Sequence, residues 1–170
     1  MKTLILSSSL SAHSRSYLLC RAVADALKDR AEIDFVDLRE YELAPYHRGK
    51  TEDMRRLSRQ VAAADNYVLG MAVYDYSVND SLKIVLDNCF SGVEGKFFGI
   101  VCAAGGLRSY LSTMHLTQIC MNEWRMIQLP RVIYATGADF DGDTICNEDL
   151  LQRIHTFAGE FHSIGKKLLS

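Results

Sequence analysis

Along the chain, short apolar runs alternate regularly with stretches in which apolar residues lie three and four positions apart. Short runs and alternating segments are typical of strands, and the wider spacing is typical of helices that bury one face. Strands are expected at residues 3–7, 32–37, 66–71, 97–104 and roughly 127–135. Helices are expected around residues 18–27, 54–64, 82–89, 109–123 and 150–164. The pattern therefore predicts a regular alternation of strand and helix.

Five strands alternating with five helices predict a three-layer α/β/α sandwich, because right-handed crossovers place helices on both faces of a parallel sheet. The runs at 3–7, 66–71 and 97–104 are almost continuously apolar, which favours central strands. Residues 32–37 alternate acidic and apolar side chains, which favours an edge. This combination fits a flavodoxin-like, five-stranded parallel sheet of order 2-1-3-4-5. We expect residues 1–170 to form a single domain of this class.

The loops after the first, third and fourth strands should meet at one crevice, because such sheets bind ligands at the carboxyl ends of their strands. The first loop is rich in serine and leads directly into a helix. Hydroxyl groups beside the free N–H groups of a helix N-terminus favour a phosphate. Simple helix capping by serine is the alternative. The other two loops span residues 72–83 and 103–109, and the latter contains Gly105-Gly106.

The first loop resembles that of the NADPH-dependent FMN reductase family, flavodoxin-like proteins that include quinone and azo-dye reductases. The family motif Gly-Ser-x-Arg-x-x-Ser is matched at Ser9 and Ser14, whereas Ser8 replaces Gly and Ser11 replaces Arg. The missing Arg removes a charge-assisted contact to phosphate of about 1.5–3 kcal/mol. Arg15 is the candidate replacement.

The resemblance extends over about residues 3–165 and includes the second and third loops. The family's second motif, Pro-x-Tyr-Asn-x-Ser-x-Pro-Gly-x-Leu-Lys-Asn, is matched at Tyr74, Ser77, Leu82 and Lys83. Departures from it are Ala72 for the first Pro, Asp75 for Asn, and Asn79-Asp80 for Pro-Gly. Gly105-Gly106 matches the glycine turn that lies beside the flavin in the family.

Membership of this family would imply an FMN-dependent NAD(P)H oxidoreductase that reduces quinones, flavins, azo compounds or similar small acceptors by hydride transfer through flavin. No catalytic side chain and no metal are expected, because the flavin carries the chemistry. The resemblance implies a cofactor site formed by Ser9, Ser11, Ser14, Arg15, Ser16, Val73, Tyr74, Asp75, Tyr76, Ala104, Gly105 and Gly106. His13 is a further candidate in the first loop.

Two other functions are compatible with the same fold. A flavodoxin-like electron carrier would need no pyridine nucleotide, but such carriers dock through strongly acidic surfaces and the formal net charge here is −2. A flavin-free binding or regulatory module is favoured by the changed motif positions Ser11, Asp75 and Asn79-Asp80.

Charge, apolar run length and cysteine content indicate which classes of partner and which cellular compartment to expect. The small net charge gives no basic footprint for nucleic acid, and the apolar runs are too short to span a membrane. Five scattered cysteines without a C-x-x-C pair indicate reduced thiols, as in the cytoplasm.

Two further segments carry expectations of their own. Residues 139–143 begin like a calcium loop, but Thr144 stands where glycine is required, so a solvated loop is expected. Apolar side chains around the fourth helix, Met121 and Trp124 among them, predict a subunit interface and a homodimer or tetramer. For Trp124, a place in the core is the alternative.

Overall fold

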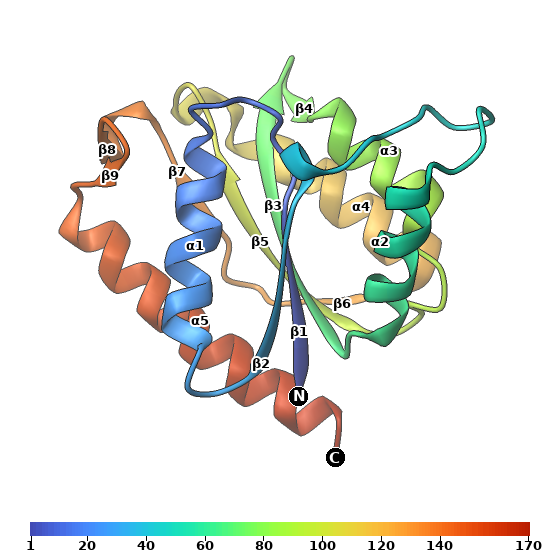
Figure 1. The fold of residues 1–170 in the computed structure, drawn as a ribbon. Helices are drawn as coiled ribbons and strands as arrows, with labels where there is room; N and C mark the ends of the chain where they lie inside the picture. Colours follow the sequence, from blue (N-terminus) through green and yellow to red (C-terminus); the bar gives the residue numbers. More distant parts are fainter.

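The computed structural model describes residues 1–170, and its centre is a sheet whose long strands are all parallel (Figure 1). The long strands occur in the order β2-β1-β3-β5. Two short strands, β6 and β7, pair in succession along the outer side of β5. The parallel strands are β1 (Lys2–Ser7), β2 (Glu32–Asp37), β3 (Asn66–Tyr74), β5 (Phe97–Ala103), β6 (Ile127–Gln128) and β7 (Ile133–Ala135).

This arrangement confirms the predicted order 2-1-3-4-5, with the fifth strand divided into β6 and β7. The division falls around Pro130, which has no backbone N–H to donate to a neighbouring strand. The β2 strand lies at the edge of the sheet, as its acidic positions predicted. Its Asp34 accepts a hydrogen bond from Gln60 Nε2 at 3.0 Å, so the partly buried carboxylate is satisfied.

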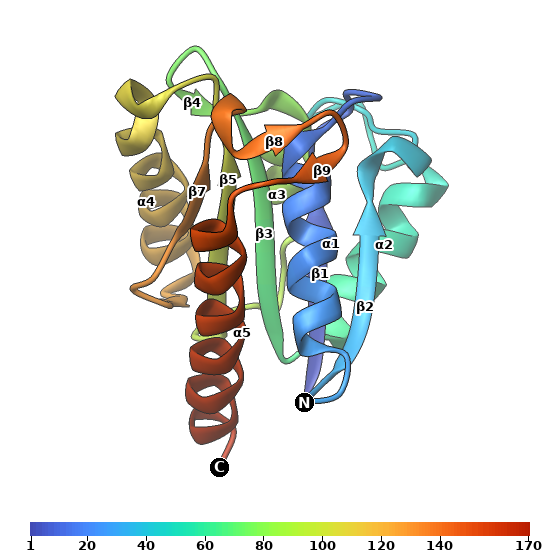
Figure 2. The same cartoon turned by 90° about the vertical axis from the view of Figure 1, so that its left-hand side faces the viewer.

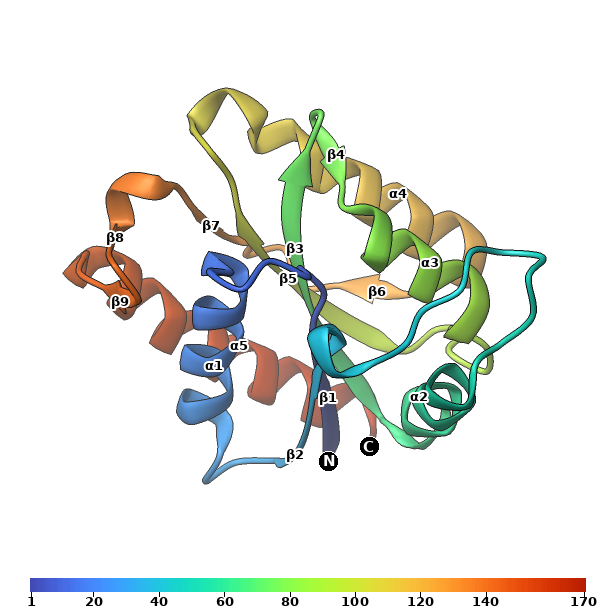
Figure 3. The ribbon, with the colours of Figure 1, turned by 45° about the horizontal axis from the view of Figure 1, so that its top comes forward.

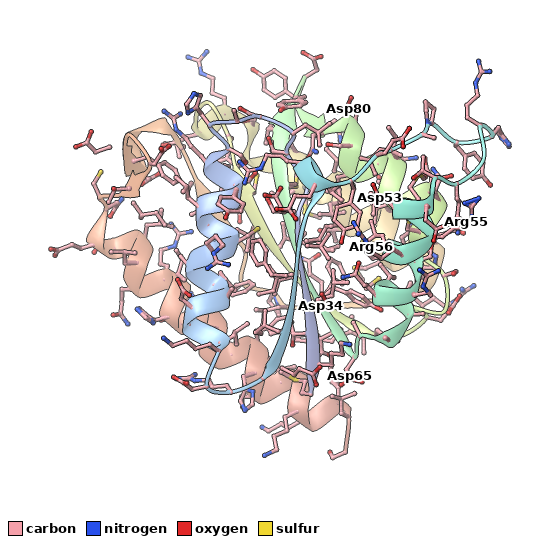
Figure 4. The ribbon with its side chains drawn as sticks, in the orientation of Figure 1. Asp34, Asp53, Arg55, Arg56, Asp65 and Asp80 are labelled. Atoms are coloured by element: carbon pink, nitrogen blue, oxygen red, sulfur yellow. The ribbon has the colours of Figure 1, made fainter.

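Helices cover both faces of the sheet (Figures 1 and 2). One layer contains α1 (Arg15–Leu27) and α5 (Glu148–Leu168). The opposite layer contains α2 (Glu52–Ala63), α3 (Asp80–Cys89) and α4 (Thr113–Trp124). Figure 4 labels Asp53, Arg55 and Arg56 on α2, where Arg56 and Asp53 form an ion pair of 3.1 Å.

Alternation along the strands divides the apolar core between the two layers. Leu4 and Leu6 of β1 pack in the cluster under α2, α3 and α4, whereas Ile5 packs in the cluster under α1 and α5. On β5, a Cβ added to Gly99 would lie 2.5 Å from Phe157 of α5. Glycine at this position therefore lets the last helix approach the sheet closely.

The loop after β3 is more ordered than the sequence predicted. The β3 strand continues past Met71 to Tyr74 and forms an antiparallel hairpin with β4 (Ser77–Val78). The turn residues Asp75 and Tyr76 both have positive φ, 48° and 60°, as a two-residue type I′ turn requires.

The predicted fourth helix begins differently from the expectation. A 3₁₀ helix, η2, occupies Leu107–Ser112 before the α-helical part starts at Thr113. Trp124 at the end of α4 is buried and packs against Phe90 with ring centroids 5.6 Å apart. Of the two places expected for Trp124, the core and a subunit interface, the structure therefore shows the core, where this side chain joins the cluster under α2, α3 and α4.

The segment before α5 was expected to be a solvated loop and is instead folded. It contains a 3₁₀ turn, η3 (Gly137–Asp139), followed by the hairpin β8 (Phe140–Asp141) and β9 (Thr144–Ile145). Phe140 provides the reason, because its buried ring joins the core cluster under α1 and α5.

The cysteines and the helix lengths bear on the remaining predictions from the sequence, reduced thiols and the absence of a membrane span. Four of the five cysteines are buried and none is paired. Burial raises the pKa of Cys20, Cys102 and Cys120 to about 12, so these thiols stay protonated and unreactive at neutral pH. None of the helices combines the length and apolar character that a transmembrane span requires.

Candidate functional site

A cavity of about 430 Å³ opens at the carboxyl ends of β1, β3 and β5, the edge of the sheet that Figure 3 brings forward. We refer to it as the serine-loop cavity. It is lined by Ser9, Ser11, His13, Ser14, Arg15, Ser16, Ala72, Val73, Tyr74, Ala103, Ala104, Gly105, Gly142 and Asp143. The three loops that the topology was expected to bring together therefore share one cavity.

A second cavity of about 590 Å³ adjoins the first and shares Val73 and Gly105 with it. It is lined by Val73, Asp75, Tyr76, Gly105, Gly106, Leu107, Arg108 and Ser109. Nine of the twelve predicted site residues line the serine-loop cavity, and the other three, Asp75, Tyr76 and Gly106, line the second cavity.

Serine hydroxyls organise the backbone of the first loop. Ser14 is the N-cap of α1, and its Oγ accepts a hydrogen bond from the Tyr17 N–H at 3.1 Å. Ser9 Oγ accepts from the Ser11 N–H at 3.3 Å. An oxygen that accepts an N–H bond still has its own proton to donate. Capping and ligand binding, the two interpretations of this loop, are therefore compatible at the same side chains.

Few cations are available beside these hydroxyls. Arg39 is held by the Asp37 carboxylate, with Nε–O distances of 3.0 and 2.9 Å, and this hydrogen bonding raises the pKa of Arg39. Arg15 lies on the cavity with its guanidinium 5.7 Å from the centroid of the Phe140 ring. Arg15 and His13 are the basic side chains that line the cavity. The N-terminus of α1 adds a partial positive charge from its free N–H groups.

Asn79 joins the first loop to the second and was not among the predicted site residues. Its side chain is fully buried; its Nδ2 donates to the Ser8 carbonyl at 3.1 Å, and its Oδ1 accepts from the Ala72 N–H at 3.1 Å. Ser81 Oγ donates to the same Ser8 carbonyl at 2.6 Å, and Ser8 Oγ donates to the Gly70 carbonyl at 2.5 Å. The only sequence signal was the departure from Pro-Gly at Asn79-Asp80, which carried no structural meaning by itself.

The glycine turn after β5 lies open beside both cavities. A Cβ added to Gly105 or Gly106 would meet no atom within 4 Å, and Gly106 has an extended φ of −171°. Neither crowding within the chain nor a left-handed backbone explains glycine at these positions. A flat ligand lying against the backbone would explain it, because side chains here would fill that space.

The residues that sequence reasoning missed belong to two kinds. Ala72 and Ala103 are the first residues of the predicted second and third loops, but they were not among the predicted site residues. Gly142 and Asp143 come from the β8–β9 hairpin, which follows the last strand of the sheet. The Asp and Gly residues of that segment are typical of a turn, but the sequence predicted only a solvated loop there.

Comparisons with known proteins were made by sequence and by structure. The sequence model of the NADPH-dependent FMN reductase family matches residues 1–141. No curated protein matches the chain in a sequence search.

Among solved structures, an oxidoreductase from Corynebacterium diphtheriae is 21% identical with a TM-score of 0.75, covering 98% of this chain and 97% of its own. The flavoenzyme NAD(P)H:(acceptor) oxidoreductase (FerB) from Paracoccus denitrificans is 14% identical with a TM-score of 0.77 and the same coverage. An FMN-dependent NADH-azoreductase from Bacillus anthracis in complex with FMN is 15% identical with a TM-score of 0.67, and both chains are fully covered. At these identities the likeness establishes the fold.

Proposed function

The chain belongs to the NADPH-dependent FMN reductase family, and from this membership we propose that it is an FMN-dependent NAD(P)H oxidoreductase that reduces small acceptors. The observation that carries the proposal is the meeting of the serine loop, the β3–β4 hairpin and the Gly105-Gly106 turn on adjoining cavities. Quinones, flavins and azo compounds are the proposed acceptors, and the azoreductase among the similar structures supports the last of these.

The donor set of the serine-loop cavity fits the phosphate of FMN. Ser9 has a proton to donate, and Arg15 provides a positive charge at the α1 N-terminus. The Ser14 and Ser16 hydroxyls lie 3.1 Å apart and hydrogen-bond to each other, so one of their two protons is left for a ligand. Ser11 supplies a further hydroxyl in the loop. These residues would bind and orient the phosphate, which fixes one end of the cofactor.

The other end of the cavity fits a planar ring. Val73 and Tyr74 from β3 line this end of the cavity together with the small residues Ala104 and Gly105 from the turn after β5. Bound FMN supplies hydride transfer between NAD(P)H and the acceptor. The chain's own residues would therefore position the ring and leave one side open.

The second cavity is the proposed place for the nicotinamide or the acceptor. Asp75 and Tyr76 at the hairpin turn line it together with Gly106 and Arg108. Tyr76 is 64% exposed, so its ring is available to pack against an aromatic substrate. The NAD(P)H preference would be decided here.

We also propose a homodimer or tetramer, one domain over residues 1–170, and a cytoplasmic location. One sheet carries both core clusters, which supports a single domain. The unpaired cysteines suit a reducing compartment. Apolar side chains are exposed on η2 and α4 next to the second cavity, which supports a subunit interface there.

The test is oxidation of NADH or NADPH by the FMN-reconstituted protein, followed at 340 nm with a soluble quinone, an azo dye or excess FMN as acceptor. We expect turnover that requires protein and FMN together. FMN binding without NAD(P)H oxidation would indicate an electron carrier, and absence of FMN binding would indicate a flavin-free module.

A further inference from the structure

The tip of the β8–β9 hairpin forms part of the wall of the serine-loop cavity. Phe140 pairs with Ile145 and Asp141 with Thr144, so Gly142 and Asp143 form the turn. Gly142 has a φ of 54°, which glycine adopts without strain. The hairpin lies beside the N-terminal end of α1 in Figure 2, and both turn residues line the cavity.

The base of the hairpin is firmly held, so the turn has a defined position. The Asp139 carboxylate accepts hydrogen bonds from the Thr136 N–H and from Asn147 Nδ2, both at 2.6 Å. The Cys146 N–H donates to the Asp139 carbonyl at 3.0 Å. Phe140 is buried in the core beneath α1. Asp143 is therefore presented to the cavity by an anchored element.

Asp143 is an uncompensated negative charge at this place. It takes part in none of the ion pairs of the structure, and no hydrogen bond reaches its carboxylate. Arg15 and His13 line the same cavity, and neither forms an ion pair with it. An anion held by the serine loop would meet this carboxylate as well as the positive end of α1.

We propose that Asp143 is a specificity-determining residue. Its charge lowers the affinity of the site for the flavin phosphate, so that riboflavin and FMN are both substrates. The inference rests on the proposed flavin site. A phosphomonoester carries about −1.5 to −2 charges at pH 7, and riboflavin lacks it. Repulsion from Asp143 therefore acts on FMN alone. Residue 11 adds no compensating cation, because serine occupies it. Asp143 lies just after the residues that the family model matches, 1–141.

The experiment compares wild type with Asp143→Asn and with a matched control, Asp141→Asn, in the same hairpin. Dissociation constants for FMN and riboflavin are measured by quenching of flavin fluorescence at low salt. We expect Asp143→Asn to bind FMN roughly three- to tenfold more tightly and riboflavin with unchanged affinity. The gain should shrink at high salt, and Asp141→Asn, which does not line the cavity, should match wild type.

Each of three other outcomes would contradict the inference in a different way. Equal changes for FMN and riboflavin would place Asp143 on the part common to both flavins and overturn the inference. An unchanged FMN affinity in Asp143→Asn would also overturn it while leaving the proposed flavin site intact. If wild type binds neither flavin, the proposed function fails and the inference fails with it.

Discussion

Individual side chains in the serine loop serve the fold and the proposed ligand at once. Ser14 caps α1 through the Tyr17 N–H, and Ser9 fixes the turn through the Ser11 N–H. Both side chains are nearly buried, yet both line the cavity. Replacing either serine therefore changes local stability as well as binding, and the two effects must be measured separately.

The double variant Ser9→Ala/Ser14→Ala should weaken FMN far more than riboflavin. Loss of two hydrogen bonds to a charged group costs roughly 3–6 kcal/mol of binding free energy if additive, and less where water substitutes. Loss of the Ser14 cap should also lower the free energy of unfolding by about 1 kcal/mol. Fluorescence titration and urea denaturation measure the two effects. Equal weakening of both flavins would contradict the phosphate role.

Asn79→Ala should destabilise the protein by about 2–4 kcal/mol, measured by urea denaturation. The substitution leaves the partly buried Ala72 N–H without the Asn79 acceptor and removes the Nδ2 donor from the buried Ser8 carbonyl. Because Asn79 ties the two loops together, affinities for FMN and riboflavin should fall by similar factors. A selective loss of FMN would mean that Asn79 acts on the phosphate instead of on the loops.

At the scale of elements, the sequence predicted the main strands and helices because their apolar spacing is long and regular. The two small hairpins escaped prediction. β4 and β9 have two residues each, too few for a period to be visible, and the turn at Asp75-Tyr76 lacks the usual glycine. The serine-loop residues were found because they directly follow a buried strand. Asp143 was missed because its segment follows the last strand and is rich in Asp and Gly.

The anchor of the β8–β9 hairpin should be sensitive to acid. Although partial burial opposes it, hydrogen bonds from Thr136 and Asn147 hold the pKa of Asp139 below its usual 3.8. A carboxyl with a lowered folded pKa stabilises the protein above about pH 3.8, and this contribution is lost as pH falls through the folded pKa. Asp139→Asn should therefore cost about 1–3 kcal/mol at pH 7.

The cost of Asp139→Asn should shrink progressively below about pH 3.8, because the carboxyl of the unfolded chain takes up a proton there and the folded one follows as pH falls through its lowered pKa. Urea denaturation of both proteins between pH 7 and pH 3 measures the difference. Asp141→Asn, at the exposed side of the same hairpin, should show no such difference. A constant gap across this range would show that the Asp139 charge does not hold the hairpin.

For the molecule as a whole, the most apolar exposed surface lies on η2 and the start of α4. Leu107 is 78% exposed, Leu111 74% and Met114 53%. Leu107 also lines the second cavity, so a subunit covering this surface would enclose the proposed substrate space. The interface predicted from the fourth-helix region thus moves toward its N-terminal end, since Trp124 is buried.

Leu111→Glu should convert the proposed homodimer to a monomer, because a charge placed in an apolar interface has no partner. Sedimentation velocity of both proteins measures the change, and Leu151→Glu at an exposed position of α5 is the comparison. A wild-type protein that is monomeric at all concentrations would contradict the proposed assembly.

Binding of FMN is the claim on which the rest depends, and direct titration of the purified protein with FMN tests it. We expect quenching of flavin fluorescence and a shifted flavin absorption spectrum, saturating at about one FMN per chain, because three loops define one cavity. Substitution of Gly105 by Leu should abolish the saturation while leaving the far-ultraviolet circular dichroism unchanged, since a side chain there meets no protein atom within 4 Å of its Cβ. A wild-type protein that fails to quench FMN at micromolar concentration would contradict the account.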